Sequence, residues 1–308
     1  MVIRTGIAGF SEGNGHPFSF SAIVNGYNES GFAAAGWPVI LDYLRRQPGN
    51  RFGIGNARIT HAWTQDPAYT AKLCAACHID HNCADISEMS GAIDALIIAR
   101  DDWESHASLA LPFLLSGVPV FVDKPLTLSS SELEEFIPFL RSGKLMSCSG
   151  FRYAAELDAM RLPEPETGDV RLISGTVLNG MAKYGVHLIE AVASLGAAFE
   201  RPIALTRLKA SHDSFLLHFE NGVPFHLDCL GSVCKTFHIS VFGKQAHRHF
   251  DLHDNFSAFR RTLEHFFTMV SSGIPPIEPA VTIHMMRMLI AAQKLAPGET
   301  VHFELSNS

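Results

Sequence analysis

Lys124 is the first residue in this sequence whose type and setting suggest chemistry. It follows Asp123 and an apolar run, residues 118–122, and Pro125 comes directly after it. A short apolar run bounded by turn residues is typical of a buried strand, so Lys124 should lie at a strand end. A lysine in a half-buried cleft is less easily kept charged, which suits it to proton transfer near neutral pH. The alternative is a surface lysine that follows an edge strand.

His187 is the second candidate for proton transfer. It lies in a predicted helix, residues 181–195, and Lys183 precedes it by one helical turn, so both side chains should share a face. A histidine can act as general acid or base because its unperturbed pKa is close to neutral. The alternative is a histidine that only packs at a domain boundary.

A glycine-rich stretch, residues 9–15, follows the first predicted strand, residues 3–10. Glycines after a strand let the backbone approach a ligand, and amides at a helix start can bind a phosphate. Helical spacing resumes over residues 21–27 and 38–46, with an irregular connection between them. The candidate ligand-binding residues here are Gly9, Phe10, Ser11, Gly13, Asn14 and Gly15.

The order of predicted elements gives the fold class. Up to residue 149, strands (57–63, 92–99, 118–122, 144–149) alternate with helices (67–77, 104–116, 129–141), which predicts a parallel, doubly wound, Rossmann-type sheet. Later strands (170–178, 203–210, 214–219, 224–229, 236–242) are mostly hairpin-linked, and helices 154–161, 181–195, 256–272 and 279–295 accompany them. We therefore expect an α/β fold with a dinucleotide-binding domain, residues 1–123, and an α+β domain with a mostly antiparallel open sheet, residues 124–308.

The segment 120–126, Val-Phe-Val-Asp-Lys-Pro-Leu, resembles the Glu-Lys-Pro signature of the Gfo/Idh/MocA oxidoreductases, with Asp123 in place of the glutamate. The stretch 93–99, His106 and Gly117 are also similar to that family, and the resemblance extends from about residue 3 to residue 187. It implies that Lys124 reaches the substrate hydroxyl beside a nicotinamide. Lys183 to His187 is similar to the family's Asp-x-Gly-x-His, which implies that His187 is the general acid or base.

The resemblance also implies a bound NAD or NADP, although several positions depart from the family pattern. Ser11 and Asn14 stand where Gly-x-Gly-x-x-Gly has its second and third glycines, and Thr64 stands where a ribose-binding acid is usual. Lys183 replaces the family's aspartate. The implied cofactor residues are the glycine-rich stretch with Thr64, Asp123 and Lys124, and the implied substrate residues are Arg152, Tyr153, Lys183 and Tyr184.

These features lead to one functional prediction and one alternative. We expect an NAD(P)-dependent oxidoreductase that acts on a CH–OH group of a sugar, a nucleotide-linked sugar or a related cyclic polyol. The alternative is a non-redox protein whose degenerate dinucleotide site serves ligand binding or assembly, as the changes at Ser11, Asn14, Thr64 and Lys183 indicate.

Composition limits the partners. A net charge of -7 and the lack of a basic, aromatic-interleaved run argue against nucleic acid. No run of about 18 apolar residues indicates a membrane span, and the start of the chain does not resemble a signal peptide. We therefore expect a cytoplasmic protein, and the histidines that alternate with apolar residues in the later strands predict a homo-oligomer formed through that sheet.

Cys74, Cys77, His78, His81 and Cys83 form a pattern similar to a haem or zinc site. Cys74 and Cys77 fall on the predicted helix 67–77, where packing accounts for them. We therefore expect structural thiols and no metal.

Overall fold

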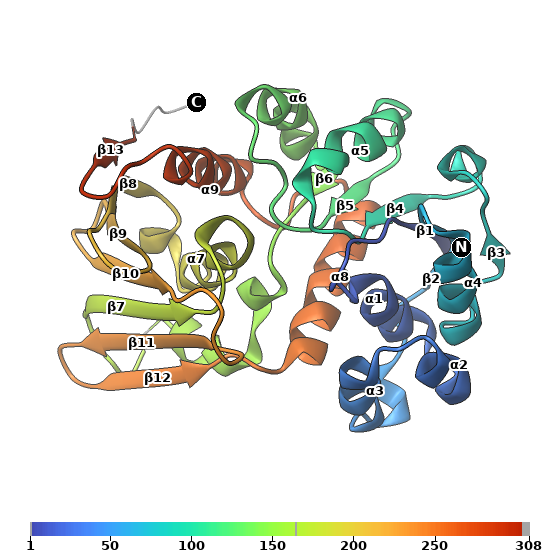
Figure 1. Cartoon of the computed structure of the whole chain (residues 1–308), viewed down its shortest axis with the longest axis horizontal. Helices are drawn as coiled ribbons and strands as arrows, with labels where there is room; N and C mark the ends of the chain where they lie inside the picture. Colours follow the sequence, from blue (N-terminus) through green and yellow to red (C-terminus); the bar gives the residue numbers. More distant parts are fainter. Residues whose placement is uncertain (1, 164, 304–308) are drawn as a thin grey trace. The chain divides into compact units, whose positions relative to one another are not determined.

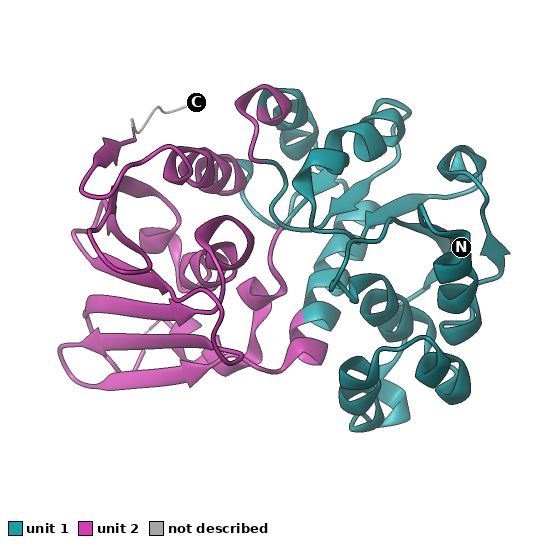
Figure 2. Cartoon of the chain, viewed as in Figure 1, with its two compact units in different colours: residues 1–127, 134–147, 259–279 teal, residues 128–133, 148–258, 280–308 magenta. Residues whose placement is uncertain are grey.

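The computed structural model describes residues 2–163 and 165–303, and this part of the chain clusters into two compact units (Figure 2). The first unit contains residues 1–127, 134–147 and 259–279, and the second contains residues 128–133, 148–258 and 280–308. The predicted boundary at residue 123 falls within the first of these segments. No helix in the described part of the chain is long and apolar enough to cross a membrane.

The first unit is built on a six-stranded sheet in which every neighbouring pair is parallel. The strand order β3-β2-β1-β4-β5-β6 is that of a dinucleotide-binding fold, which confirms the predicted Rossmann-type sheet. The strands are β1 (Ile3–Ala8), β2 (Ala57–Trp63), β3 (His81–Asn82), β4 (Ala95–Ile98), β5 (Val120–Val122) and β6 (Leu145–Met146).

Helices connect these strands, and their starts follow local capping chemistry. Asp66 caps α4 by accepting hydrogen bonds from the amides of Ala68 and Tyr69, and Pro67 occupies the first helical position, where its missing N–H is not needed. The helices of this unit and its borders are α1 (His16–Asn25), α2 (Glu29–Ala34), α3 (Pro38–Arg45), α4 (Pro67–Ala76), α5 (His106–Leu115), α6 (Ser130–Arg141) and α8 (Asn255–Ser272).

The sequence placed the first helix too late. We predicted helical spacing from residue 21, whereas α1 begins at His16 with a proline in its first turn. The connection expected to be irregular contains α2, because the Asn28 side chain accepts a hydrogen bond from the Gly31 amide and starts that helix. The glycine-rich stretch therefore ends directly at a helix N-terminus.

The second unit contains a seven-stranded sheet in the order β12-β11-β7-β10-β9-β8-β13, in which only β7 and β10 pair in parallel (Figure 1). The predicted, mostly antiparallel sheet is thus confirmed. Its strands are β7 (Val170–Val177), β8 (Pro202–Arg207), β9 (Asp213–Phe219), β10 (Pro224–Cys229), β11 (Phe237–Gly243), β12 (His247–Asp251) and β13 (Thr300–His302).

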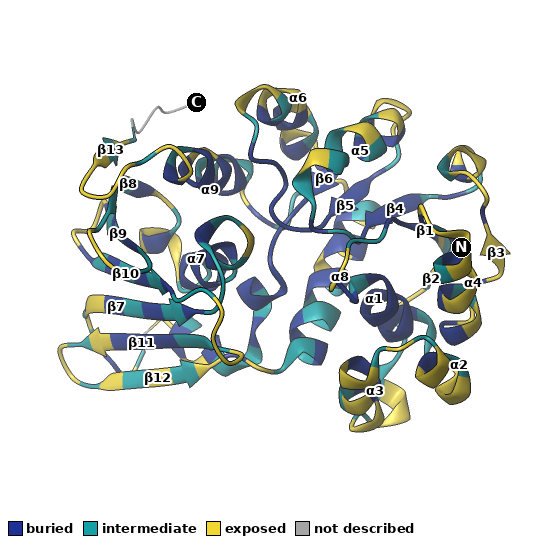
Figure 3. Cartoon of the chain, viewed as in Figure 1, coloured by how far each residue is buried: buried dark blue, intermediate teal, exposed yellow. Residues whose placement is uncertain are grey.

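One face of this sheet is packed and the other carries polar side chains. Ile173, Gly175 and Val177 of β7 are buried, and a Cβ on Gly175 would lie 3.0 Å from Leu188 of α7 (Val186–Ala193). Figure 3 shows the buried positions of this unit gathered around α7 and α9 (Pro279–Ala292). The alternate residues of each strand, many of them histidines, face away from this core.

The predicted helix 181–195 has a different start. Residues Met181–Gly185 form a π-helical turn, and α7 follows only from Val186. A Cβ on Gly185 would meet the sulfur of Met181 at 2.6 Å, so the wider turn fits where a side chain would clash. Shorter 3-10 segments in this region include Gly150–Tyr153 and Ala155–Arg161.

Candidate functional site

The glycine-rich loop connects the carboxyl end of β1 to the start of α1. Gly9 and Gly13 have φ of +88° and +76°, which only glycine adopts easily. A Cβ on Gly9 would lie 2.4 Å from Cδ of Arg100, whereas a Cβ on Gly13 would meet nothing within 4 Å. Gly13 therefore gives one open place where the backbone can be approached closely.

The other loop residues pack against their neighbours. Gly15 lies under Trp37 and Ile40, since a Cβ there would come within 2.3 Å of Cδ1 of Ile40. The Phe10 ring lies 4.0 Å from the Tyr69 ring, centroid to centroid. Gly15 thus serves close packing at the start of α1, which is the role of the third glycine in dinucleotide-binding loops.

Asn14, at the position of that third glycine, belongs to a buried polar network. Its Nδ2 donates to Oδ2 of Asp123 at 3.1 Å, and its Oδ1 accepts from the His16 amide at 2.8 Å. The His16 ring also contacts Asp123, with Nδ1 and Oδ2 2.5 Å apart. The loop is thereby joined to the segment that carries the Asp-Lys-Pro motif.

Asp123 is buried and charged in this setting. Burial would raise its pKa, but the neighbouring His16 and Lys124 outweigh that effect and hold the pKa well below its ordinary value. The Lys124 amide donates to Oδ1 of Asp123 at 2.8 Å. Asp123 therefore acts as a fixed anion between the glycine loop and Lys124.

Lys124 lies at the carboxyl end of β5, is only 4% exposed, and is joined to Pro125 by a cis peptide bond. Its Nζ is 3.6 Å from Oδ2 of Asp101, a residue that follows β4. His106 fixes the same region because its two ring nitrogens lie 2.9 Å from the Leu126 carbonyl and 2.8 Å from the Arg100 carbonyl. Lys124 is therefore not the surface lysine of the alternative interpretation.

Thr64 follows β2 but turns its hydroxyl toward its own chain. Its Oγ1 donates to the Asp66 carbonyl at 2.8 Å and contacts Oγ1 of Thr70 at the same distance. The side chain is 3% exposed. Thr64 thus supports the start of α4, and its predicted contact with a ribose stays a prediction.

In the second unit, His187 occupies the first turn of α7. Its Nδ1 is 2.6 Å from Oγ of Ser149. The ring contacts Phe151, Tyr184 and Phe237 at centroid distances of 5.4 to 5.8 Å. The hydroxyl and the three rings fix the orientation of the imidazole.

Arg152 is engaged inside this unit. Its Nε donates to Oε2 of Glu190 at 2.5 Å, and both side chains are buried. Burial raises the pKa of Glu190, although the Arg152 guanidinium lowers it. This contact favours a structural role for Arg152 over the implied contact with substrate. Tyr153 is also mostly covered and follows Arg152 in the same 3-10 segment.

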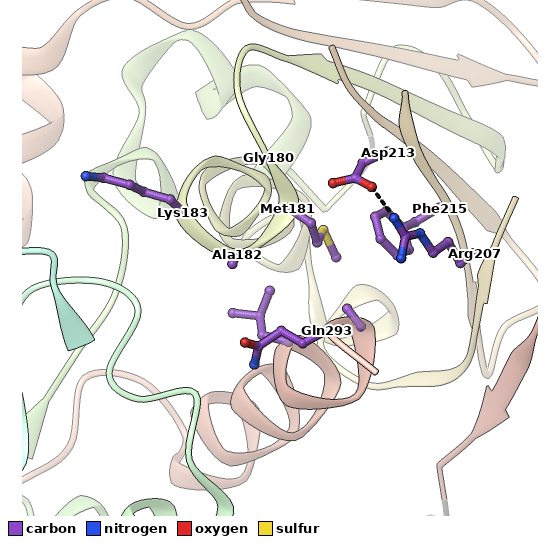
Figure 4. Close-up of a pocket in the computed structure, with 10 residues that line it drawn as sticks. Gly180, Met181, Ala182, Lys183, Arg207, Asp213, Phe215 and Gln293 are labelled. Carbon is purple, nitrogen blue, oxygen red and sulfur yellow. Dashed lines mark hydrogen bonds and ion pairs between the residues drawn. The ribbon is translucent and has the colours of Figure 1, made fainter. Parts of the chain in front are cut away.

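Lys183 is exposed on the π-helical turn and lines a pocket of about 420 Å³ within the second unit (Figure 4). The pocket also contains the Arg207–Asp213 ion pair, with a nitrogen–oxygen distance of 2.6 Å. Figure 4 shows the Lys183 side chain extending away from that pair. Tyr184 instead lies on the His187 side of the turn.

The cysteines of the pattern that resembles a metal site are packed inside the first unit. Burial raises the pKa of Cys74 to about 11 and raises that of Cys77 well above its ordinary value. The Cys77 thiol lies 3.7 Å from the Phe18 carbonyl. Within residues 2–163 and 165–303 no group of three or more potential metal ligands is assembled, and all six cysteines are free.

The structure brings the predicted residues together in two sets, one in each unit. Asn14, Asp123 and Lys124 form part of one network, and His187 and Tyr184 form part of another. Sequence reasoning missed four of their partners. Three of these, Asp101, His16 and Ser149, directly follow a strand end or the glycine loop, which is where ligand sites of parallel sheets gather; the fourth is Phe237.

The strand order, the glycine loop and the residues at the strand ends define a class of protein that carries a dinucleotide-binding α/β unit. Residues 31–151 match the family described as "Oxidoreductase family, NAD-binding Rossmann fold", the Gfo/Idh/MocA family. The resemblance found in the sequence is confirmed over these residues, which are similar to that family.

One curated relative is a protein of Amycolatopsis mediterranei (strain S699), provisionally described as a UDP-kanosamine synthase oxidoreductase subunit. It is 29% identical over 110 residues, which is 35% of this chain and only 30% of that protein. The similarity to it is thus restricted to part of each chain.

Solved structures are similar over the whole length. Myo-inositol 2-dehydrogenase from Lactobacillus plantarum matches with a TM-score of 0.77 and 14% identity, over 99% of this chain and 100% of that one. Myo-inositol dehydrogenase from Lactobacillus casei, solved with NAD(H) and myo-inositol, matches with a TM-score of 0.73 and 13% identity, over 100% and 98%. GnnA from Acidithiobacillus ferrooxidans, a UDP-N-acetylglucosamine 3-dehydrogenase, matches with a TM-score of 0.68 and 14% identity, over 96% of this chain and 97% of that one. At these identities the likeness shows a shared fold.

Proposed function

We propose that this protein is an NAD(P)-dependent oxidoreductase that acts on a CH–OH group of a sugar, a nucleotide-linked sugar or a related cyclic polyol. The observation that carries the proposal is the buried Lys124 at the end of β5, tied through Asp123 to the glycine loop at the end of β1. The inositol and nucleotide-sugar dehydrogenases with the same fold support this substrate class.

The loop residues fit a dinucleotide in one important respect. Gly13 leaves open space where a Cβ would stand, and the N-cap residue of α1, Gly15, has no side chain to bond the first-turn amides, of which Asn14 accepts from that of His16. Uncapped amides at a helix N-terminus bind phosphate groups. Gly9, Phe10, Ser11, Gly13, Asn14 and Gly15 are therefore the residues proposed to hold the pyrophosphate.

The bound cofactor would accept or supply a hydride, and the protein would manage the proton. Lys124 and His187 are the residues proposed to take up or deliver the hydroxyl proton, each already oriented by a polar neighbour, Asp101 and Ser149 respectively. Tyr184 and Lys183 are the proposed substrate contacts on the π-helical turn, and Arg152 and Tyr153 remain weaker candidates.

The first experiment separates redox activity from ligand binding. Purified protein should bind NAD or NADP in calorimetric titration, and the absorbance of reduced nicotinamide should rise when inositols, sugars or nucleotide-linked sugars are added. Both cofactors are tested in parallel, because Thr64 supplies no carboxylate that would repel the 2′-phosphate of NADP. The tighter binding of the two then identifies the cofactor. Lack of binding of either cofactor would refute the proposal.

The second candidate is a non-redox protein that retains the fold for ligand binding or assembly. The observation that favours it is the pair of buried carboxylates, Asp101 and Asp123, beside a loop that lacks two of the three usual glycines. Cofactor binding without turnover on any substrate of the proposed class would support it.

We also propose that the protein forms a homo-oligomer through the polar face of its second sheet and resides in the cytoplasm. The histidines and apolar side chains on that face support the first statement, and six free thiols support the second.

A further inference from the structure

Ser11 stands where the resembled loop has its second glycine, and its side chain makes two hydrogen bonds with a single residue. Its Oγ donates to Oδ1 of Asp101 at 2.7 Å and accepts from the Asp101 amide at 3.2 Å. A glycine could make neither contact. The substitution is therefore tied to one particular carboxylate.

That carboxylate faces Lys124 with its other oxygen. Oδ2 of Asp101 lies 3.6 Å from Nζ of Lys124, and the two side chains are 7% and 5% exposed. Buried charges are screened far less by salt than exposed ones, so this pair interacts more strongly than a surface ion pair. Ser11, Asp101 and Lys124 follow the ends of β1, β4 and β5, three neighbouring strands.

A third residue, His106, also fixes the segments that carry Asp101 and Lys124. His106 bonds the carbonyls of Arg100 and Leu126, which lie next to Asp101 and close to Lys124 in the sequence. The two turns are thus fixed relative to each other. Ser11 adds the remaining restraint by fixing the rotation of the carboxylate itself.

We propose that Ser11 and Asp101 are positioning residues for Lys124: Asp101 holds the ammonium in place, and Ser11 holds Asp101. The side chain of Ser11 thereby serves the lysine, and only its backbone is left to contact the cofactor's phosphates. The contact itself is independent of the proposed function, whereas its effect on turnover rests on that function.

The contact can be tested without activity by a double-mutant cycle. Trp37, Trp63 and Trp103, the three tryptophans of the chain, all lie in the first unit, so tryptophan fluorescence reports its unfolding in urea. Asp101→Asn should lower the urea midpoint, and this shift should fall by at least half in a Lys124→Met background, because the interaction between Asp101 and Lys124 is already absent there.

Asp102→Asn is the matched control. Asp102 is the next residue after Asp101 and pairs with Arg100, and we expect the same midpoint shift from Asp102→Asn with or without Lys124→Met. Ser11→Ala should reproduce part of the Asp101→Asn shift, and Ser11→Thr, which keeps the hydroxyl, should recover it. Equal shifts from Asp101→Asn in both backgrounds would overturn the proposal, and Ser11→Ala keeps the test available should Asp101→Asn fail to fold.

The effect on chemistry is measured on a substrate that the parent protein turns over. Asp101→Asn and Ser11→Ala should each lower turnover roughly 10-fold, because Lys124 is then held less closely in its place. Ser11→Thr should restore turnover. Unchanged turnover in Asp101→Asn would contradict the positioning role. Coupling between Asp101 and Lys124 in a protein without any turnover would support the contact and reject the proposed function. Turnover without such coupling would support the proposed function and reject the contact.

Discussion

At the scale of single residues, the departures from the family pattern are compensated by contacts within the same region. Asn14 replaces a glycine and donates to Asp123, while the shorter Asp123 replaces a glutamate and still meets His16 and Lys124. Each change alone would indicate a degenerate site. Together they form one network of buried polar groups in which these members are hydrogen-bonded. Such a network stabilises the fold only when its members have partners, because an unpaired buried polar group is destabilising.

The two proposed proton-transfer residues give the first prediction at this scale. Lys124→Ala and His187→Ala should each lower turnover by roughly 10²- to 10⁴-fold, the usual contribution of general acid–base catalysis. NAD(P) binding, measured by calorimetry, should change far less, because the proposed pyrophosphate contacts lie in residues 9–15.

Exposed residues of the same types provide the controls for that prediction. Lys72→Ala on α4 and His253→Ala, whose side chain is 77% exposed, should leave turnover unchanged. Near-normal turnover of both Lys124→Ala and His187→Ala would show that these two residues are structural, and would favour the non-redox candidate.

The pKa of Asp123 gives a pH-dependent prediction. A carboxyl group whose folded-state pKa is lowered stabilises the fold above its unfolded pKa of about 3.9, and this contribution is lost as the pH falls through the folded-state value. Asp123→Asn should therefore destabilise the first unit by about 1–3 kcal/mol at about pH 7, and the difference from the parent should shrink toward about pH 3.

Urea unfolding followed by tryptophan fluorescence at several pH values measures this difference. Asp94→Asn, which breaks a more exposed pair with Arg4, should have a smaller effect at neutral pH. A difference between Asp123→Asn and the parent that grows on acidification would contradict the assigned sign.

At the scale of elements, sequence periodicity predicted most of the central strands and helices. Sequence periodicity did not reveal strands made mostly of polar residues, very short strands, or a helical turn that departs from α-helical spacing. His247 to Asp251 alternates polar residues on the open face and was not recognised as β12, and the two-residue β3 is too short to show a period. The π-helical turn Met181–Gly185 ends at a glycine whose Cβ would meet the sulfur of Met181, and no local pattern reveals this packing.

The same limit applies to the candidate site. Lys124 and His187 were found because a motif and a strand end mark them. Asp101 was missed because its importance depends on which strand ends become neighbours, and that follows from the strand order rather than from local sequence. Ser149 was missed because its contact with His187 joins the segment after β6 to helix α7, far away in the sequence.

The attachment of α7 to the Gly150–Tyr153 segment gives a prediction at this scale. Arg152→Met leaves the carboxylate of Glu190 buried without its partner, so the second unit should lose about 3–5 kcal/mol of stability. The double variant Arg152→Met with Glu190→Leu should recover much of this loss, because two apolar side chains can pack in the same space.

Hydrogen exchange of the α7 amides, read by mass spectrometry, measures this change in the unit that has no tryptophan. Arg171→Met, an exposed arginine on β7 of the same unit, is the control and should leave α7 exchange unchanged. Equal protection of α7 in Arg152→Met and in the parent would show that the pair does not anchor the helix.

At the scale of the whole molecule, the second sheet presents a face with histidines on several neighbouring strands. His238 lies opposite Asp251, with Nδ1 and Oδ1 2.7 Å apart, and Ser240 joins the rings of His238 and His249. Leu172 and Phe242 pair across β7 and β11 on this face and are 36% and 37% exposed. Apolar side chains within a polar, hydrogen-bonded sheet face are a common composition for contacts between subunits.

The last prediction concerns self-association through this face. The parent protein should sediment as an oligomer at micromolar concentration, and Leu172→Arg with Phe242→Arg should convert it to a monomer, because like charges would then face each other across a symmetric interface. Val39→Arg with Leu115→Arg changes two more exposed apolar residues of the first unit, at 72% and 76% exposure, and should leave the oligomer intact. Far-UV circular dichroism should be unchanged in both double variants, so that a loss of association is not confused with unfolding. A parent protein that sediments as a monomer, or an oligomer that only the Val39 and Leu115 pair dissociates, would show that the second sheet is not the interface.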